Sequence, residues 1–229
     1  MPLADDIRAA GARAIAALAH AHDYHTFSTR VWGAFKDSVR EGGAYSFRNP
    51  ATGTRFTGEA LVPWAERHVE PALGRAALYE FVSALEDFVF DLLRLWLAAH
   101  PRSLSRKQVE LGAILDLPDK PAIVLSVVDK ELNELKYQRL ADWFAYLDKL
   151  VRPGCPSTDE IASLAEIKAT RDVLAHNQGV ANAVYVQKAG PLARFAVGEP
   201  VEANPPYIRA AHALLKVVSE LAESAASRA

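Results

Sequence analysis

The sequence has a single cysteine and a single methionine among 229 residues, and the cysteine sets a first limit. Cys155 lies between two prolines in the stretch RPGCPST. A lone cysteine cannot form an internal disulfide, so the chain is not a disulfide scaffold and fits a reducing compartment. We interpret Cys155 as a free loop thiol, because a catalytic thiol needs a neighbouring base that the sequence does not identify.

Strong charge of one sign and long apolar runs are also absent. The net charge of -2 excludes a protein that coats nucleic acid through its overall field and leaves only local contacts. The most apolar stretch, residues 88–99, is interrupted by Asp91 and Arg94 and predicts a buried core helix, not a membrane span. The stretch MPLADDIRAAG has no apolar core of signal-peptide type, so we expect a cytoplasmic protein without membrane contact.

Helical periodicity is what the sequence does have, and it predicts an all-α protein. We expect a short β-hairpin as the exception, in the extended stretches AVYVQ and ARFAV of residues 183–197, before the last helix. Residues 41–60 have the composition of a loop or a second short hairpin, and the last six residues are expected to be frayed. The predicted helices are 4–21, 25–40, 71–99, 103–114, one or two helices in 121–151, then 157–177 and 205–223.

A boundary is placed near residue 70, where Pro71 suits the first turn of a helix. The predicted organisation is an N-terminal helical extension, residues 1–70, followed by a helical bundle, residues 71–229. Trp96, Trp143 and Phe144 stand at helical spacing and are assigned to the core of that bundle.

The helix predicted at 157–177 has both of its ends marked. Ser157 and Glu160 form a capping box at its start, and Gly179 supplies the left-handed residue that commonly follows a last turn. Its final turns carry the stretch RDVLAHNQG, residues 171–179. A basic pair, Arg171 and His176, therefore lies at the C-terminal end of a helix.

The spacing within this stretch suggests separate tasks for its side chains. Five positions rotate by about 140° around a helix, so Arg171 and His176 are poorly placed as partners within one chain. Asp172 and His176 share a face, and the carboxylate is expected to hold the imidazole and raise its pKa. Arg171, supported by Lys168 one turn earlier, is suited to clamp a phosphate. On the residues alone a purely structural alternative is open, since arginine and histidine near helix ends also serve ion pairs and the helix dipole.

The run R-D-V-L-A-H-N, at the end of a capped helix, resembles the R-x(4-6)-H signature of HEPN-domain proteins, and LYEFVSALEDFVFDLL resembles their first core helix. The resemblance is to the bacterial branch called RiboL-PSP-HEPN and covers about residues 71–225. It implies a HEPN-like helical bundle that forms a homodimer, with the two motifs facing each other across the two-fold axis. Arg171 of one copy and His176 of the other would then meet at one phosphate.

The activity that the resemblance implies is metal-independent cleavage of RNA, without a cofactor, as a toxin or defence effector acting with an antitoxin or nucleotidyltransferase partner. His176 would be the acid or base and Arg171 would stabilise the phosphorus transition state. Asn177 would bind a phosphate oxygen or the turn backbone, and Glu86 or Asp87 would orient Arg171. Tyr185 would line the cleft or stack on a base. The alternative function is a catalytically inactive HEPN dimer that binds nucleotides or RNA or serves as a scaffold.

Two further clusters each have a functional and a structural interpretation. His20, His22, Asp23 and His25 offer four ligand types within six residues, but one local cluster rarely closes a metal shell, so no metal site is assigned. The basic residues within 102–107 would extend an RNA track or form a solvated helix start.

Overall fold

The computed structural model describes residues 3–104, 108, 109 and 111–229, and helices predominate there, which confirms the all-α class. The predicted basic track at 102–107 falls partly on residues 105–107, outside the described part of the chain. The elements in chain order are α1 (Leu3–Arg40), β1 (Ser46–Arg48), β2 (Arg55–Thr57), α2 (Gly58–Ala99), the 3-10 helix η1 (Pro101–Leu104), α3 (Leu111–Asp116), α4 (Lys120–Lys136), α5 (Leu140–Val151), α6 (Thr158–His176), α7 (Ala183–Ala189), the 3-10 helix η2 (Gly190–Leu192), α8 (Pro205–Leu214) and α9 (Val217–Ala226).

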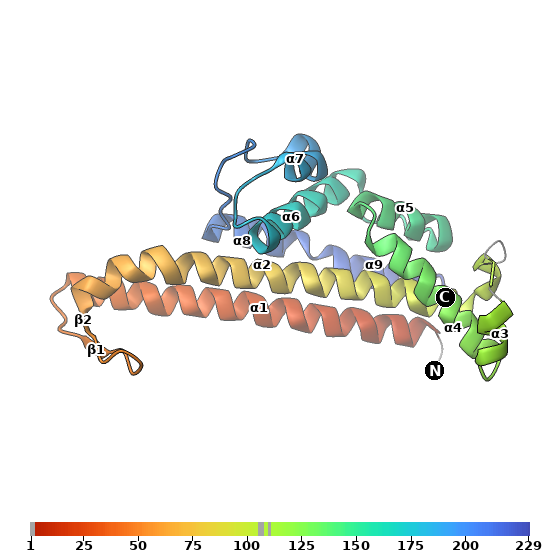
Figure 1. The fold of residues 1–229 in the computed structure, drawn as a ribbon, viewed down its shortest axis with the longest axis horizontal. Coiled ribbons are helices and arrows are strands. Elements are labelled where there is room, and N and C mark those ends of the chain that lie inside the picture. Colours follow the sequence, from red (N-terminus) through yellow and green to blue (C-terminus); the bar gives the residue numbers. More distant parts are fainter. Residues whose placement is uncertain (1–2, 105–107, 110) are drawn as a thin grey trace.

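Two long helices, α1 and α2, run side by side in opposite directions along the whole molecule (Figure 1). The prediction of two helices in residues 4–40 is wrong, because α1 continues through residues 21–25. Ala21 and His25 are buried one turn apart, so packing holds the helix where its sequence pattern is weak. The short hairpin expected in residues 41–60 is present, with β1 antiparallel to β2 and Phe47 opposite Phe56.

Helix α2 begins at Gly58, well before the predicted start at Pro71. Pro63 and Pro71 both lie inside it, although an interior proline removes a backbone hydrogen bond and costs about 3 kcal/mol. Burial of Ala65, between the two prolines, and of Leu73, after Pro71, offsets part of that cost. The division of the chain near residue 70 remains a prediction, and α2 crosses that point without interruption.

The core lies where the middle of α2 meets the other helices. Phe81, Leu85, Val89 and Leu92 of α2 are at most 2% exposed, and α1, α4, α6, α8 and α9 pack around this helix. The core assignments of Trp96, Trp143 and Phe144 are confirmed, since none is more than 7% exposed. No helix in the described residues is long and apolar enough to cross a membrane.

The β-hairpin predicted in residues 183–197 is wrong, because residues 183–189 form helix α7. The Asn182 side chain caps this helix by accepting from the Tyr185 backbone N–H at 2.9 Å. Tyr185 and Ala189, four residues apart, are both buried, so the helical period prevails over the β-branched composition. The fraying expected in residues 224–229 is also wrong in part, since α9 reaches Ala226 and buries it.

The sequence predicted one or two helices in residues 121–151, and the structure has two, α4 and α5. Helix α4 ends at Lys136, and α5 starts after Arg139, whose backbone N–H donates to Asp142 at 3.1 Å. The indole N–H of Trp143 donates to the carbonyl of Leu135 at 2.8 Å and ties the two helices together. Helices α4 and α5 lie next to the start of α6 (Figure 1), and Tyr137 from the connection between them lines the same cavity as the motif of α6.

Candidate functional site

Helix α6 places the motif, and both of its ends are as predicted. The Ser157 hydroxyl accepts from the Glu160 backbone N–H, and the Glu160 carboxylate accepts from the Ser157 backbone N–H at 2.9 Å. At the other end Gly179 has a φ of 72° and its N–H donates to the carbonyl of Val173 at 3.2 Å. Backbone hydrogen bonds thus fix the turn that ends α6 after His176.

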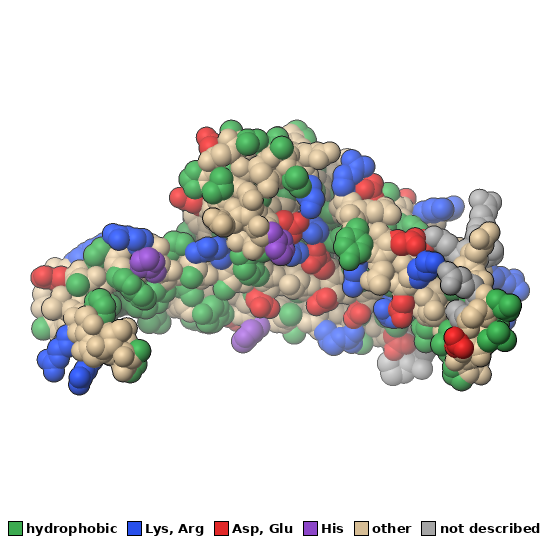
Figure 2. All heavy atoms as spheres, in the orientation of Figure 1, with side chains coloured by type: hydrophobic (Ala, Val, Ile, Leu, Met, Phe, Trp, Pro, Cys, Tyr) green, Lys and Arg blue, Asp and Glu red, His purple; other side chains and the backbone are tan. Residues whose placement is uncertain are grey.

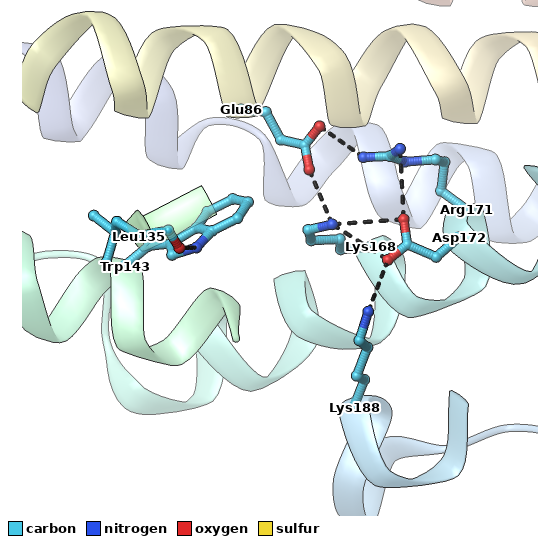
Figure 3. Close-up of polar contacts among 7 residues, drawn as sticks. All are labelled: Glu86, Leu135, Trp143, Lys168, Arg171, Asp172 and Lys188. Atoms are coloured by element: carbon cyan, nitrogen blue, oxygen red, sulfur yellow. Dashed lines mark hydrogen bonds and ion pairs between the residues drawn. The ribbon is translucent and has the colours of Figure 1, made fainter. Parts of the chain in front are cut away.

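Five charged side chains from three helices meet beside this turn (Figure 3). Glu86 of α2 contacts Arg171 at 2.7 Å (Oε2 to Nη2) and Lys168 at 3.0 Å (Oε1 to Nζ). Asp172 lies 3.3 Å from the Nζ of Lys168 and 3.4 Å from Nη1 of Arg171. Lys188 of α7 reaches the same Asp172 carboxylate at 3.3 Å. The expected contact between Glu86 and Arg171 is therefore present, while Asp87 is exposed and faces elsewhere.

The cluster carries more positive than negative charge. Three cationic groups face two carboxylates, and the side chains of Lys168 and Arg171 are each only 16% exposed. Among the described residues neither Nε nor Nη2 of Arg171 has an aligned hydrogen-bond acceptor, although Nη2 is close to Glu86. Unfilled buried donors cost free energy. Both nitrogens are closed off from solvent, so an anion would bind them only after the Arg171 side chain turns toward the cavity.

The cluster forms the wall of a cavity of about 490 Å³ between α6, α7 and the end of α4. His176 lies at its exposed rim, together with Tyr137, which is 93% exposed, and Val184, which is 53% exposed. Charged side chains of both signs gather beneath α7 in the surface view (Figure 2). The cavity is lined by Glu86, Tyr137, Lys168, Ala169, Arg171, Asp172, Val173, His176, Asn177, Asn182, Val184, Tyr185 and Lys188.

The structure modifies two expectations about the motif. Arg171 and His176 diverge around α6, yet both line this one cavity within a single chain. The expected pair of Asp172 with His176 does not form: Asp172 binds Lys168, Arg171 and Lys188 instead. In the part of the chain that the structure describes, no side chain holds the His176 imidazole by a hydrogen bond or an ion pair.

Asn177 and Tyr185 have structural tasks in this state. The Asn177 amide donates to the carbonyl of Val180, which is the turn-backbone alternative of the prediction. Tyr185 lines the floor of the cavity but is 1% exposed, and its hydroxyl accepts from the Arg194 backbone N–H at 3.0 Å. A base cannot stack on a ring that is covered to this degree, so in this structure Tyr185 only lines the cavity.

Sequence reasoning missed Lys188 and Tyr137. Lys188 was missed because this region was predicted as a β-hairpin. In the helix that starts after Asn182, residues 185 and 188 are one turn apart and face the same neighbour. Tyr137 lies in the short connection after α4, which no motif marks. Asn182 is a residue type that favours the start of a helix, and this signal in the sequence would have predicted the helix that carries Lys188.

The histidines of α1 have other contacts in the structure. No group of three or more His, Cys, Asp or Glu side chains is arranged as metal ligands among the described residues. His22 instead stacks on His212 of α8 with ring centroids 4.0 Å apart, and His25 is 5% exposed. Cys155 is a free and partly buried thiol, and burial raises its pKa.

No protein-family model, curated protein or solved structure matches this chain.

Proposed function

We propose that the chain is a metal-independent endoribonuclease of HEPN type that cleaves RNA at the cavity around Arg171 and His176. One observation carries the proposal: an exposed imidazole stands at the rim of a cavity whose inner wall holds an excess of positive charge. The wall suits a phosphate and the rim suits a proton transfer on its ribose. The agreement of this arrangement with the R-x(4)-H signature supports the assignment.

The chemistry needs a base, an acid and a clamp. His176 takes the proton of the ribose 2′-OH, the 2′ oxygen attacks phosphorus, and the bond from phosphorus to the 5′ oxygen breaks. The leaving oxygen receives a proton from His176 of a second copy, and the products are a 2′,3′-cyclic phosphate and a 5′-OH end. Arg171 stabilises the additional charge on the phosphoryl oxygens, and Glu86 holds its guanidinium in place.

The rim of the cavity favours a second copy as its cover. Tyr137 and Val184 are 93% and 53% exposed, and Val180, whose carbonyl accepts from the Asn177 amide, is 40% exposed. Exposed apolar side chains around a charged cavity are typical of an interface. A two-fold axis there would join two cavities into one cleft with both arginines and both histidines, as an isologous dimer does.

A second candidate is a dimer that binds RNA or nucleotides without cutting them. It is favoured by the state of the cations, because Glu86 and Asp172 already engage Lys168, Arg171 and Lys188. In addition, His176 lacks the carboxylate neighbour that the sequence predicted for it. Binding would then need only an exchange of Lys188 from Asp172 to a phosphate, with no proton transfer.

The test separates the two candidates. Purified wild type, Arg171→Ala, His176→Ala and the control Arg67→Ala, which changes an exposed arginine of α2 outside the cavity, are incubated with end-labelled RNA in EDTA. Cleavage by wild type and control, lost by at least about 100-fold in both site variants, supports the nuclease. Binding without cleavage by any of the four supports the second candidate, and equal cleavage by all four contradicts both.

The biological setting is part of the proposal. A toxin of this kind would slow growth when expressed alone and would be relieved by an antitoxin or nucleotidyltransferase partner. Growth that slows with the wild type and not with His176→Ala, at equal protein levels, is the expected result. Equal slowing by both chains would separate the growth effect from RNA cleavage.

A further inference from the structure

Helix α1 has two apolar rows, and only one of them is covered. The inner row packs against α2 and α9 and alternates in steps of three and four residues. The residues of the inner row are Ile7, Gly11, Ala14, Leu18, Ala21 and His25. An outer row with the same alternation faces solvent, and we call it the outer seam. The outer seam consists of Ala17, His20, Tyr24, Phe27, Val31 and Ala34, all of them exposed.

The middle of the outer seam is the most apolar part of that surface. Tyr24, Phe27 and Val31 are 53%, 64% and 67% exposed, on two successive turns. Steps of three and four residues keep them in one line along the helix, which is the pattern of a coiled-coil seam. Hydrophobic side chains also gather on the part of the α1 and α2 pair that extends beyond the other helices (Figure 2). A continuous exposed apolar line of this kind indicates an interaction surface.

We propose that the outer seam packs against the outer seam of a second copy of this chain, as an antiparallel two-helix coiled coil. With the two-fold axis between residues 25 and 26, Tyr24 of each copy lies against Phe27 of the other. Val31 then lies against His20, and Ala34 against Ala17, so the large and small positions match in every layer. The paired segment is about 26 Å long, at 1.5 Å per residue from residue 17 to residue 34.

The charges beside the outer seam select both the direction and the register. Asp23, Arg30 and Asp37 flank it at intervals of seven residues, and all three are exposed. In the antiparallel register described, Asp23 of each copy faces Arg30 of the other, which gives two reciprocal ion pairs. A shift by seven residues in one direction sets Arg30 against Arg30 and Asp23 against Asp37, and a shift in the other direction sets Asp23 against Asp23. A parallel pair brings none of these charges together, so one arrangement alone is complementary.

The partner of this surface is therefore this chain itself. A helix of another protein would need its own matching charges, whereas self-pairing uses charges that the chain already has. The surface is independent of the proposed nuclease site, because α6 and α7 lie on the other side of α2 from α1 (Figure 1). Two different isologous interfaces join four chains where their two-fold axes cross at right angles, and a longer row of chains where they do not.

The test is the mass of the full-length protein in solution, by light scattering after size exclusion. Phe27→Asp, at a side chain that is 64% exposed, is expected to lower the particle mass by half or more and leave the circular dichroism spectrum unchanged. The mass falls from four or more chains to two where the cavity-side dimer also forms, and from two to one where it does not. Failure of the nuclease proposal therefore does not disturb the reading of this result.

Charge variants give the matched control. Arg30→Asp places like charges opposite each other and is expected to lower the mass as Phe27→Asp does, while Arg30→Asp combined with Asp23→Arg re-forms both reciprocal pairs and restores it. RNA cleavage per chain, where present, is expected to persist in Phe27→Asp. A wild-type mass that Phe27→Asp does not change overturns the proposal, and so does a double charge variant that stays at the lowered mass.

Discussion

Glu166 is the residue that fixes the floor under the candidate site. It is 5% exposed and accepts four hydrogen bonds: from Thr170 at 2.7 Å, Tyr207 at 2.8 Å, Arg194 at 2.9 Å and Tyr185 at 3.3 Å. Burial first, and then the charge of Glu166, raises the pKa of Tyr207, so its hydroxyl remains a donor. A buried carboxylate is tolerated when its lone pairs are filled in this way. Through these partners α6, α7 and α8 are held together.

We expect Glu166→Gln to lower the free energy of unfolding by about 3 kcal/mol, because it leaves the Arg194 guanidinium without its charge partner. Urea denaturation followed by circular dichroism measures the change. Glu202→Gln is the matched control, since Glu202 is an exposed side chain in the same region. An equal, small effect in both variants would show that the buried network contributes little to stability.

The stacked histidines at the junction of α1 and α8 predict a dependence on pH. Burial, then His22 and Arg209, lower the pKa of His25. Burial and His22 lower the pKa of His212, against the opposite effect of Asp23. The unfolded chain then binds more protons than the folded chain below the ordinary pKa of 6.5. These two histidines contribute stability above that value, and the contribution is lost as the pH falls through their lowered pKa values.

The free energy of unfolding is therefore expected to fall between pH 8 and pH 5, and to fall less in His212→Gln. Denaturation series at pH 8, 6.5 and 5 measure it, with His68→Gln as the control at an exposed histidine of α2. The expected result is a smaller change of the free energy of unfolding with pH in His212→Gln than in wild type. Parallel slopes for all three proteins would contradict the assignment of the pH dependence to the junction.

At the scale of the element, the sequence predicted what local signals specify. The ends of α6 follow from Ser157, Glu160 and Gly179, and the contact of Glu86 with Arg171 followed from the resemblance. The continuity of α1 and α2 could not be predicted, because it depends on packing between segments that are far apart in the sequence. Pro71 is a starting signal locally, and tertiary contacts overrule it. The helix α7 was missed because three β-branched or aromatic residues outweighed the Asn182 cap.

Two glycines of α1 offer a matched test of helix packing. A Cβ at Gly11 would lie 2.5 Å from the Cβ of Ala222 in α9, whereas a Cβ at Gly33 would meet nothing within 4 Å. Gly11→Ala is expected to destabilise the fold by about 1–3 kcal/mol through overpacking. Gly33→Ala is expected to stabilise it by about 0.5–1 kcal/mol, because alanine favours the helix. Thermal and urea unfolding measure both, and a Gly11→Ala variant as stable as Gly33→Ala would show that α9 does not pack closely there.

At the scale of the whole molecule, the long α1 and α2 pair separates two surfaces. Helices α6 and α7, which line the cavity with Arg171 and His176, lie on one side of α2, and α1, which carries the outer seam, lies on the other (Figure 1). The proposed activity needs only the surface around the cavity, so dimer formation at the cavity is tested without changing the outer seam. Both Arg171 and His176 line the cavity of one chain, which makes it necessary to establish whether catalysis uses both residues from the same copy.

Mixing wild type with His176→Ala answers that question. The proposed mechanism needs a histidine from each copy, so a dimer of one wild-type chain and one His176→Ala chain has the base or the acid but not both, and it is inactive. Random exchange at equal amounts makes about a quarter of the dimers fully wild type, so the mixture is expected to keep about a quarter of the cleavage that the same total amount of wild type shows. Labelled RNA, and chains mixed after brief denaturation and refolding, measure it. Sites contained within single chains would instead keep about half of that cleavage, because every wild-type chain would stay active.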